Sequence, residues 1–218
     1  MENKVKLHHL VKLAISIKSI CQTTEERYLE YWKQTTPKSE GDILDRICYA
    51  ICSVHTGWKV NVRQYKNLTK YRWKENKYNI LPALKLGGGM FNQKTRALTE
   101  LLNNKRYYLA NTDPFEFRDN LTNIPCLGMA KASFASELIH PTKSNIPVCL
   151  DTHVLQWLGE KEKNGKMNRQ QYLTLENDFQ TLSNKTFIAR NILWDSQQNE
   201  ENPRYWSHPL EPKQIQIQ

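Results

Sequence analysis

The stretch LTNIPCLGMAKASFASELIHPTKSNIPVCLDTHVLQWLG, residues 121–159, decides the fold of this chain. Its first part, about residues 121–140, predicts the end of one helix, a tight hairpin and a second helix that begins at about Met129. Pro125 cannot lie inside a helix, because it lacks an N–H and its ring clashes with the preceding turn. Gly128 permits the unusual φ and the close backbone approach that such a hairpin needs. The pattern therefore predicts two helices joined by a hairpin.

The second part of the stretch, residues 148–159, brings one carboxylate to the start of a further helix. The apolar run Val148-Cys149-Leu150 ends at Asp151, and the next helix follows. A hairpin that leads into a helix points free backbone N–H groups outward, which suits a phosphate. A phosphate-binding backbone followed by a single acid is the pattern in this stretch that carries information about function. The alternatives are a tight turn without a ligand and an aspartate that only caps its helix.

Composition indicates a folded protein with a basic surface. The chain has 218 residues, 39% hydrophobic and 24% charged, and a formal net charge of +9. A polyanion is the expected partner, nucleic acid before a membrane surface, and a generic basic surface is the alternative. There is no run of about 18 apolar residues, and the N-terminus predicts an amphipathic helix instead of a signal peptide. We therefore expect a cytoplasmic or nucleoid-associated protein.

The periodicity of the chain predicts an all-α protein. We expect a single two-lobed domain over residues 1–197 and a loosely held tail over residues 198–218. The five cysteines form no CxxC pair, so we expect no metal site and no metal cluster. In residues 55–78, basic side chains alternate with aromatic ones, and Lys59 and Arg63 are candidates to neutralise phosphates. A solvated helix face is the simpler explanation for these lysines and arginines.

Four segments together resemble a known family. They are ICSVHT at 51–56, GMFNQKTRA at 89–97, IPCLGMAKA at 124–132 and VCLDTH at 148–153. In this order they are similar to the motifs of the helix-hairpin-helix DNA glycosylase superfamily, which includes endonuclease III-like enzymes. The likeness covers roughly residues 42–160.

The resemblance implies a two-lobed, all-α fold that binds double-stranded DNA across the cleft between its lobes. It implies a monomer that flips a damaged or modified base out of the duplex and hydrolyses its N-glycosidic bond. The iron–sulfur cluster of some members is absent, because no four-cysteine cluster follows the domain. Compact chains of this kind resemble phage-related ones. The excised base is therefore left undecided among oxidised bases, alkylated bases and hypermodified pyrimidines.

Two positions depart from the family pattern, and both lie in the hairpin motif. Cys126 stands where the family usually has the first hairpin glycine. Ala130 stands where lyase-competent members carry their nucleophilic lysine, and Lys131 follows one residue later, about 100° around the helix. Single-step hydrolysis is therefore favoured over a second activity, AP lyase chemistry with Lys131 as a Schiff-base nucleophile. A non-catalytic DNA-binding module is the alternative from another class.

The resemblance also assigns candidate site residues. Asp151 is the expected catalytic carboxylate, which stabilises positive charge on the sugar or deprotonates water, and Lys131 is the second catalytic candidate. The hairpin backbone is expected to bind a DNA phosphate, and its carbonyls could bind a monovalent cation. The remaining DNA-binding candidates are Pro125, Leu127, Gly128, Met129, Ala130 and His153. His55 could fill the space left by a flipped base, and Trp58 could line the pocket. The simpler alternatives are that His55 lies at a helix end on the surface, that Trp58 belongs to the core and that His153 caps its helix.

Overall fold

The computed structural model of the protein describes residues 11–158 and 167–196. Within these ranges the chain forms helices and contains no β-strand, which confirms the all-α prediction. A first helix covers residues 11–18, and the further elements are α2 (Gln22–Gln34), α3 (Glu40–Cys52), α4 (Trp58–Lys70), η1 (Lys77–Asn79), α5 (Ile80–Gly87), α6 (Phe91–Asn103), α7 (Lys105–Tyr108), α8 (Pro114–Leu121), α9 (Met129–Ile139), α10 (Thr152–Leu158), α11 (Arg169–Leu182) and α12 (Thr186–Ser196). The tail predicted over residues 198–218 lies outside the described residues.

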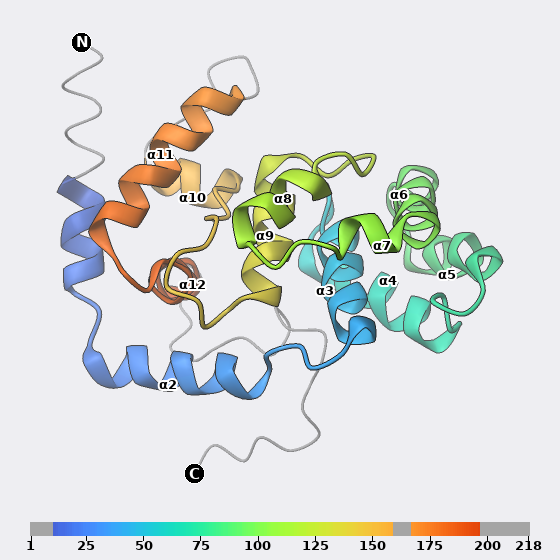
Figure 1. Cartoon of the computed structure of the whole chain (residues 1–218), viewed down its shortest axis with the longest axis horizontal. Helices are drawn as coiled ribbons and strands as arrows, with labels where there is room; N and C mark the ends of the chain where they lie inside the picture. The colour runs from blue at the N-terminus through green and yellow to red at the C-terminus, as the bar shows by residue number, and fades with distance from the viewer. Residues whose placement is uncertain (1–10, 159–166, 197–218) are drawn as a thin grey trace.

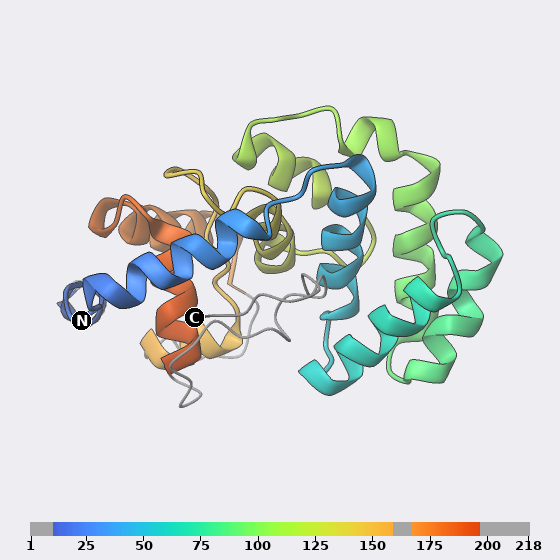
Figure 2. The ribbon, with the colours of Figure 1, turned by 90° about the horizontal axis from the view of Figure 1, so that it is seen from below.

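Two apolar clusters form the two lobes. The larger cluster draws its buried side chains from α2 to α9 and from part of α12. The smaller one lies among the first helix, the segment before α10, α10 itself and α11. In Figures 1 and 2, α4, α5 and α6 lie at one end of the molecule and α10 and α11 at the other, with α3 and α9 between them. The Asp151 segment therefore belongs to one lobe, and the turn that carries His55 belongs to the other.

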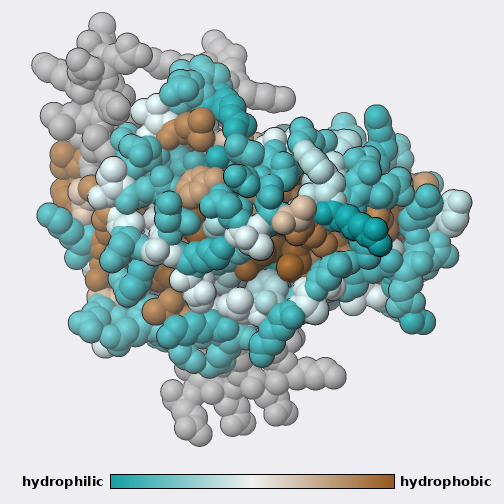
Figure 3. Space-filling model, in the orientation of Figure 1, coloured by the Kyte–Doolittle hydropathy of each residue, from teal (hydrophilic) through white to brown (hydrophobic). Residues whose placement is uncertain are grey.

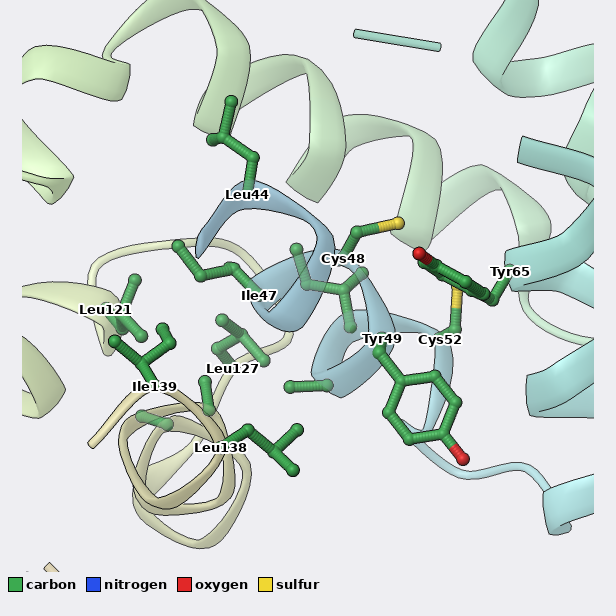
Figure 4. Close-up of a cluster of buried hydrophobic side chains, with 14 of the residues drawn as sticks. Leu44, Ile47, Cys48, Tyr49, Cys52, Tyr65, Leu121, Leu127, Leu138 and Ile139 are labelled. Carbon is green, nitrogen blue, oxygen red and sulfur yellow. The ribbon is translucent and has the colours of Figure 1, made fainter. Parts of the chain in front are cut away.

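Helix α3 is the centre of the larger lobe, as its nearly continuous apolar sequence indicates. Every residue from Leu44 to Cys52 is buried. Figure 4 shows side chains of α3 facing Leu121 at the end of α8, Leu127 in the hairpin and Leu138 of α9. The hairpin is thus attached to the core through leucine side chains. Figure 3 shows that much of the visible surface is hydrophilic and that apolar residues appear there in small groups.

The ends of several helices follow local sequence signals. Asp113 caps α8, since its Oδ1 accepts the N–H groups of Phe115 and Glu116, and Pro114 occupies the first helical position. Helix α3 is capped by Ser39, and Asp42 completes a capping box three residues later. Helix α5 ends in the predicted glycine turn, where Gly88 and Gly89 have φ of 80° and 63°.

The hairpin has the predicted bounds but a different left-handed residue. Helix α8 ends at Leu121 and α9 begins at Met129, with the turn between them. Gly128 has an ordinary φ of −84° as the N-cap of α9, so the prediction of an unusual φ there is wrong. The positive φ, 67°, belongs to Cys126. The turn between Pro125 and Leu127 requires the left-handed conformation, and the residue in the family's glycine position adopts it.

Among the described residues, no helix is long and apolar enough to cross a lipid bilayer.

Candidate functional site

Asp151 lies at the N-terminus of α10 and is half-buried. Its Oδ1 accepts the N–H of His153 at 3.1 Å and the N–H of Val154 at 3.0 Å, which is the geometry of a helix cap. The second oxygen, Oδ2, has no hydrogen-bond partner among residues 11–158 and 167–196. The cap therefore orients the carboxylate and leaves one oxygen available.

The extended segment that leads to Asp151 is held by side chains from distant helices. Its three backbone N–H groups, those of Val148, Cys149 and Leu150, bond to Glu176 Oε1 (2.7 Å), Glu137 Oε1 (2.9 Å) and the Tyr172 hydroxyl (3.1 Å). The Tyr172 hydroxyl also donates to the Val148 carbonyl at 2.6 Å. Buried backbone groups need partners, and α9 and α11 provide them here.

Both of these glutamates belong to buried ion pairs. Glu137 on α9 pairs with Arg190 on α12, and Glu176 on α11 pairs with Arg118 on α8 at 2.7 Å. Burial raises the pKa of the Glu137 carboxyl, while the Arg190 guanidinium and the Cys149 N–H oppose that rise. The same pair raises the pKa of Arg190, although burial by itself disfavours its charge. Because a broken buried pair leaves an uncompensated charge, these pairs make the position of the segment well defined.

The sequence did not indicate these supporting residues. Glu137, Tyr172, Glu176 and Arg190 occupy ordinary helix positions, and their partners lie between 12 and 58 residues away. One signal was present, because an acidic residue within the apolar stretch of α9 is unusual in a buried face. The sequence offered no means to identify the partners.

The start of α9 presents free backbone donors. The N–H groups of Lys131 and Ala132 bond to the Gly128 carbonyl, so the helix begins there. The N–H groups of Gly128, Met129 and Ala130 have no acceptor among the described residues. The side chains of Met129 and Ala130 pack against the smaller lobe, and Gly128 is exposed. These donors, at a positive helix end, form an anion-binding arrangement.

The other hairpin candidates differ in their exposure. Pro125 is exposed. The Leu127 side chain is buried in the larger core and its N–H bonds to the Ile124 carbonyl at 3.1 Å, so only its carbonyl could contact DNA. Cys126 is half-buried, and burial raises the pKa of its thiol.

Lys131 lies on α9 near both parts of the site. It is half-buried, and its Nζ lies 5.6 Å from the centre of the Phe134 ring. Burial, followed by Asp151 and Glu137, raises the pKa of Cys149, and Lys131 is among the charges that oppose this. Lys131 also adds to the lowering of the Lys94 pKa, whose main cause is burial. The ammonium is thus within electrostatic reach of the Asp151 segment and of the opposite lobe.

The remaining candidates divide between the lobes. His55 is exposed in the turn between α3 and α4, with a positive φ of 49°. Trp58 begins α4, and its side chain lies outside what the structure describes. His153 is exposed on α10, and its ring makes an edge contact with Trp194 at 6.2 Å between centres. His153 reaches Asp151 through its backbone N–H, and no hydrogen bond among the described residues joins the His55 or His153 ring to the Asp151 carboxylate.

Lys59 and Arg63 belong to a basic ridge on α4. Together with Lys66 and Lys70 they are spaced by four, three and four residues, so they lie within an arc of about 60° on the helix. All four are exposed, and none forms an ion pair with a residue that the structure describes. The opposite face of α4 is buried through Asn61, Gln64, Tyr65 and Leu68. The predicted basic face thus extends over the whole helix.

The described ranges contain no group of three or more His, Cys, Asp or Glu side chains that could hold a metal ion. A monovalent cation at the hairpin carbonyls stays a prediction.

The structure is similar to solved 8-oxoguanine DNA glycosylases. One is the enzyme of Methanocaldococcus jannaschii, with a TM-score of 0.69 and 16% identity over 88% of this chain and 94% of that one. The glycosylase/lyase of the same organism, crystallised with a 15mer DNA containing 8-oxoguanine, has a TM-score of 0.70 and 16% identity over 87% of this chain and 98% of that one. The Thermotoga maritima enzyme has a TM-score of 0.61 and 17% identity over 93% of this chain and 99% of that one.

No protein-family model matches the sequence, and no curated protein matches it. The structural likeness shows that the chain has the helical fold of these solved 8-oxoguanine DNA glycosylases, as the all-α prediction expects.

Proposed function

We propose that this protein is a DNA glycosylase that flips a damaged or modified base out of double-stranded DNA and hydrolyses its N-glycosidic bond. The observation that carries the proposal is the geometry of Asp151, whose one oxygen caps α10 while the other has no partner in the described structure. The fold shared with solved 8-oxoguanine DNA glycosylases supports the same reaction class. The protein acts as a monomer in the cytoplasm or the nucleoid.

Breaking an N-glycosidic bond gives the sugar oxocarbenium character. A carboxylate held next to that sugar stabilises the growing positive charge, or takes a proton from the attacking water. The buried ion pairs of Glu137 and Glu176 support this role, because they restrict the backbone that carries Asp151. Since a rigid carboxylate needs little rearrangement during the reaction, this arrangement favours catalysis over simple capping.

The DNA backbone binds at the start of α9. The free N–H groups of Gly128, Met129 and Ala130 receive one phosphate, and the ridge of Lys59, Arg63, Lys66 and Lys70 adds further phosphate contacts. The DNA complex of the structurally similar enzyme supports a DNA ligand for this fold. His55 fills the space left by the flipped base, Trp58 lines the pocket and His153 contacts a phosphate.

The base itself is the first variable to test. The similar structures carry the name 8-oxoguanine DNA glycosylase, so 8-oxoguanine is the first candidate. Other oxidised bases, alkylated bases and hypermodified pyrimidines are the next ones. A panel of duplex oligonucleotides, read by release of the free base, identifies the substrate.

Asp151→Asn tests the reaction. Asparagine caps a helix as well as aspartate does, so we expect the free energy of unfolding to change by less than about 0.5 kcal/mol. Base release should fall by about 100-fold or more, because the charge next to the sugar is lost, while binding to undamaged duplex stays the same.

Asp113→Asn is the matched control for this test. Asp113 is an exposed N-cap of α8 that uses its Oδ1 in the same way, so only the position differs. Equal base release by both variants would exclude a catalytic Asp151. No base release by the wild-type protein from any duplex of the panel would leave a DNA-binding module as the function.

The second activity, strand cleavage through Lys131, has one supporting observation. The Lys131 ammonium lies within electrostatic reach of the Asp151 segment. Because Ala130 occupies the usual lysine position, we expect hydrolysis and no covalent adduct when substrate DNA is treated with borohydride. An adduct that Lys131→Gln removes, and that Lys143→Gln on the α9–α10 connection leaves, would establish lyase chemistry.

A further inference from the structure

Lys94 is a completely buried lysine near the start of α6. Its ammonium donates to the Cys52 carbonyl at 2.6 Å, to Gln64 Oε1 at 2.8 Å and to Thr56 Oγ1 at 3.2 Å. An ammonium has three donors, and here each has an acceptor. Burial lowers the pKa of Lys94 to about 8, with Lys131 adding to this. The chain thus keeps a charged group inside the larger lobe although burial disfavours its charge.

The acceptors of Lys94 lie on different elements. Cys52 is the last residue of α3, whose terminal carbonyls lack partners within the helix. A cation at this end satisfies one of them and complements the helix dipole. Gln64 comes from α4, and its Nε2 donates to the Gly88 carbonyl and, at 2.8 Å, to the Gly89 carbonyl. Lys94 therefore connects the end of α3, the middle of α4 and the glycine turn.

The turns around Lys94 contain most of the left-handed backbone in the described ranges. Four residues other than glycine have a positive φ, and two of them, His55 and Met90, lie in these turns together with Gly88 and Gly89. His55 lies between Cys52 and Thr56, both of which accept from Lys94. Met90 accepts the Lys94 backbone N–H at 3.2 Å.

Left-handed backbone is unfavourable at residues other than glycine. It persists only where the surroundings hold it, and it is concentrated at functional sites. Here one buried ammonium hydrogen-bonds to both ends of the turn with His55 and is connected through Gln64 to the glycine turn.

We propose that Lys94 is a positioning residue that holds the turns at 53–57 and 88–90 in the arrangement that receives the flipped base. This proposal rests on the proposed function. Lys94 does not touch the DNA; it acts directly on the turn that carries His55 and, through Gln64, on the glycine turn. Loss of its ammonium should therefore reduce the recognition of damaged DNA more than it reduces general DNA binding.

The experiment compares Lys94→Met with Lys94→Arg and with Leu101→Ala. Methionine keeps the linear shape without donors, arginine keeps the donors, and Leu101 is a buried residue about 10 Å further along α6. Hydrogen exchange is measured on each folded variant. In Lys94→Met we expect faster exchange at the N–H groups of Val54 and Gly88, beyond the change that Leu101→Ala causes. Equal changes in the two variants would overturn the anchoring role.

The second measurement compares binding to a duplex with a tetrahydrofuran abasic-site analogue and binding to the same duplex without it. Lys94→Met should lower the preference for the analogue by about tenfold. Lys94→Arg should retain part of this preference, and Leu101→Ala should leave it unchanged. An unchanged preference in Lys94→Met would overturn the positioning role. If Lys94→Met does not fold, Thr56→Val, which removes a single acceptor, takes its place in both measurements.

The two measurements separate the two proposals. If the wild-type protein shows no preference for the analogue and releases no base, the proposed function fails. Hydrogen exchange then still decides whether Lys94 holds the two turns.

Discussion

The hairpin and the segment before Asp151 are both short connections, but they are held in different ways. In the hairpin, the N–H groups of Asn123, Ile124 and Leu127 bond to carbonyls three residues earlier, at 3.1, 3.0 and 3.1 Å. In the segment, the N–H groups of Val148, Cys149 and Leu150 bond to side chains 28, 12 and 22 residues away. One connection is closed locally, and the other is completed by tertiary structure.

The difference separates two tasks. A phosphate site needs free N–H groups at a helix end, and a local turn is enough to provide them. A catalytic carboxylate must stay close to its productive position, and a local cap alone does not hold the backbone before it. We therefore expect substitutions of distant residues to affect Asp151 strongly and the hairpin weakly.

The largest effect is expected from Glu137→Gln. The amide keeps the size of the side chain but leaves the buried Arg190 charge without its partner, at a cost of about 3–5 kcal/mol. Urea unfolding measures the loss, and base release should fall with it. The double variant Glu137→Gln/Arg190→Met should recover much of the stability, because no unpaired charge remains. Full activity of the single variant would show that the position of Asp151 does not depend on side chains from distant helices.

Acid should destabilise the protein through His140, the residue that ends α9. Burial, followed by Lys143, lowers the pKa of His140 to about 4, and Asp113 opposes this. In the unfolded chain His140 has a pKa of about 6.5, so it binds a proton at a higher pH than in the folded protein. Its contribution to the free energy of unfolding is therefore fully present above about pH 6.5 and is lost as the pH falls toward 4. At about 1.4 kcal/mol per pKa unit, the contribution is about 3 kcal/mol.

The variant His140→Phe should lack this part of the pH dependence, as measured by unfolding between pH 4 and 7. His153→Gln is the control, because His153 is exposed and should leave the profile as it is. The same profile in wild type and His140→Phe would show that another group titrates.

A smaller effect is expected from Tyr172→Phe. The change removes the acceptor of the Leu150 N–H and the donor to the Val148 carbonyl, so the free energy of unfolding should fall by about 2 kcal/mol. Base release should fall as well, since the segment before Asp151 loosens. Tyr107→Phe is the matched control on the exposed surface. Equal stability of the two variants would show that the segment does not depend on the hydroxyl.

The smallest effect is expected in the hairpin. Cys126→Gly keeps the left-handed turn and should change the free energy of unfolding by less than about 1 kcal/mol. Cys126→Val places a β-branched residue at a φ of 67° and should cost about 1–2 kcal/mol. Urea unfolding of both variants measures the contrast. A larger loss in the glycine variant would mean that the Cys126 side chain, and not its backbone, holds the turn.

Local signals in the sequence predicted much of the fold. The proline after Asp113, the three glycines at the end of α5 and the Ile124–Gly128 turn placed helix ends correctly. They did so because caps and turns depend on residues within one helical turn. The wrong prediction concerned Gly128: the pattern indicated a glycine for the unusual φ, whereas Cys126 carries it. A preference for glycine in left-handed turns is statistical, and the surrounding structure can impose that conformation on another residue.

By itself the sequence determined the all-α class, the hairpin and the position of Asp151 at a helix start, since each depends on neighbouring residues. Only the tertiary structure decided what holds Asp151 and the turns opposite it. The partners of Glu137, Glu176 and Lys94 come from helices far apart in the chain, and a buried charge is stable only where folding brings its partners together. Such pairings leave no periodic trace in the sequence, so they become visible only in the folded molecule.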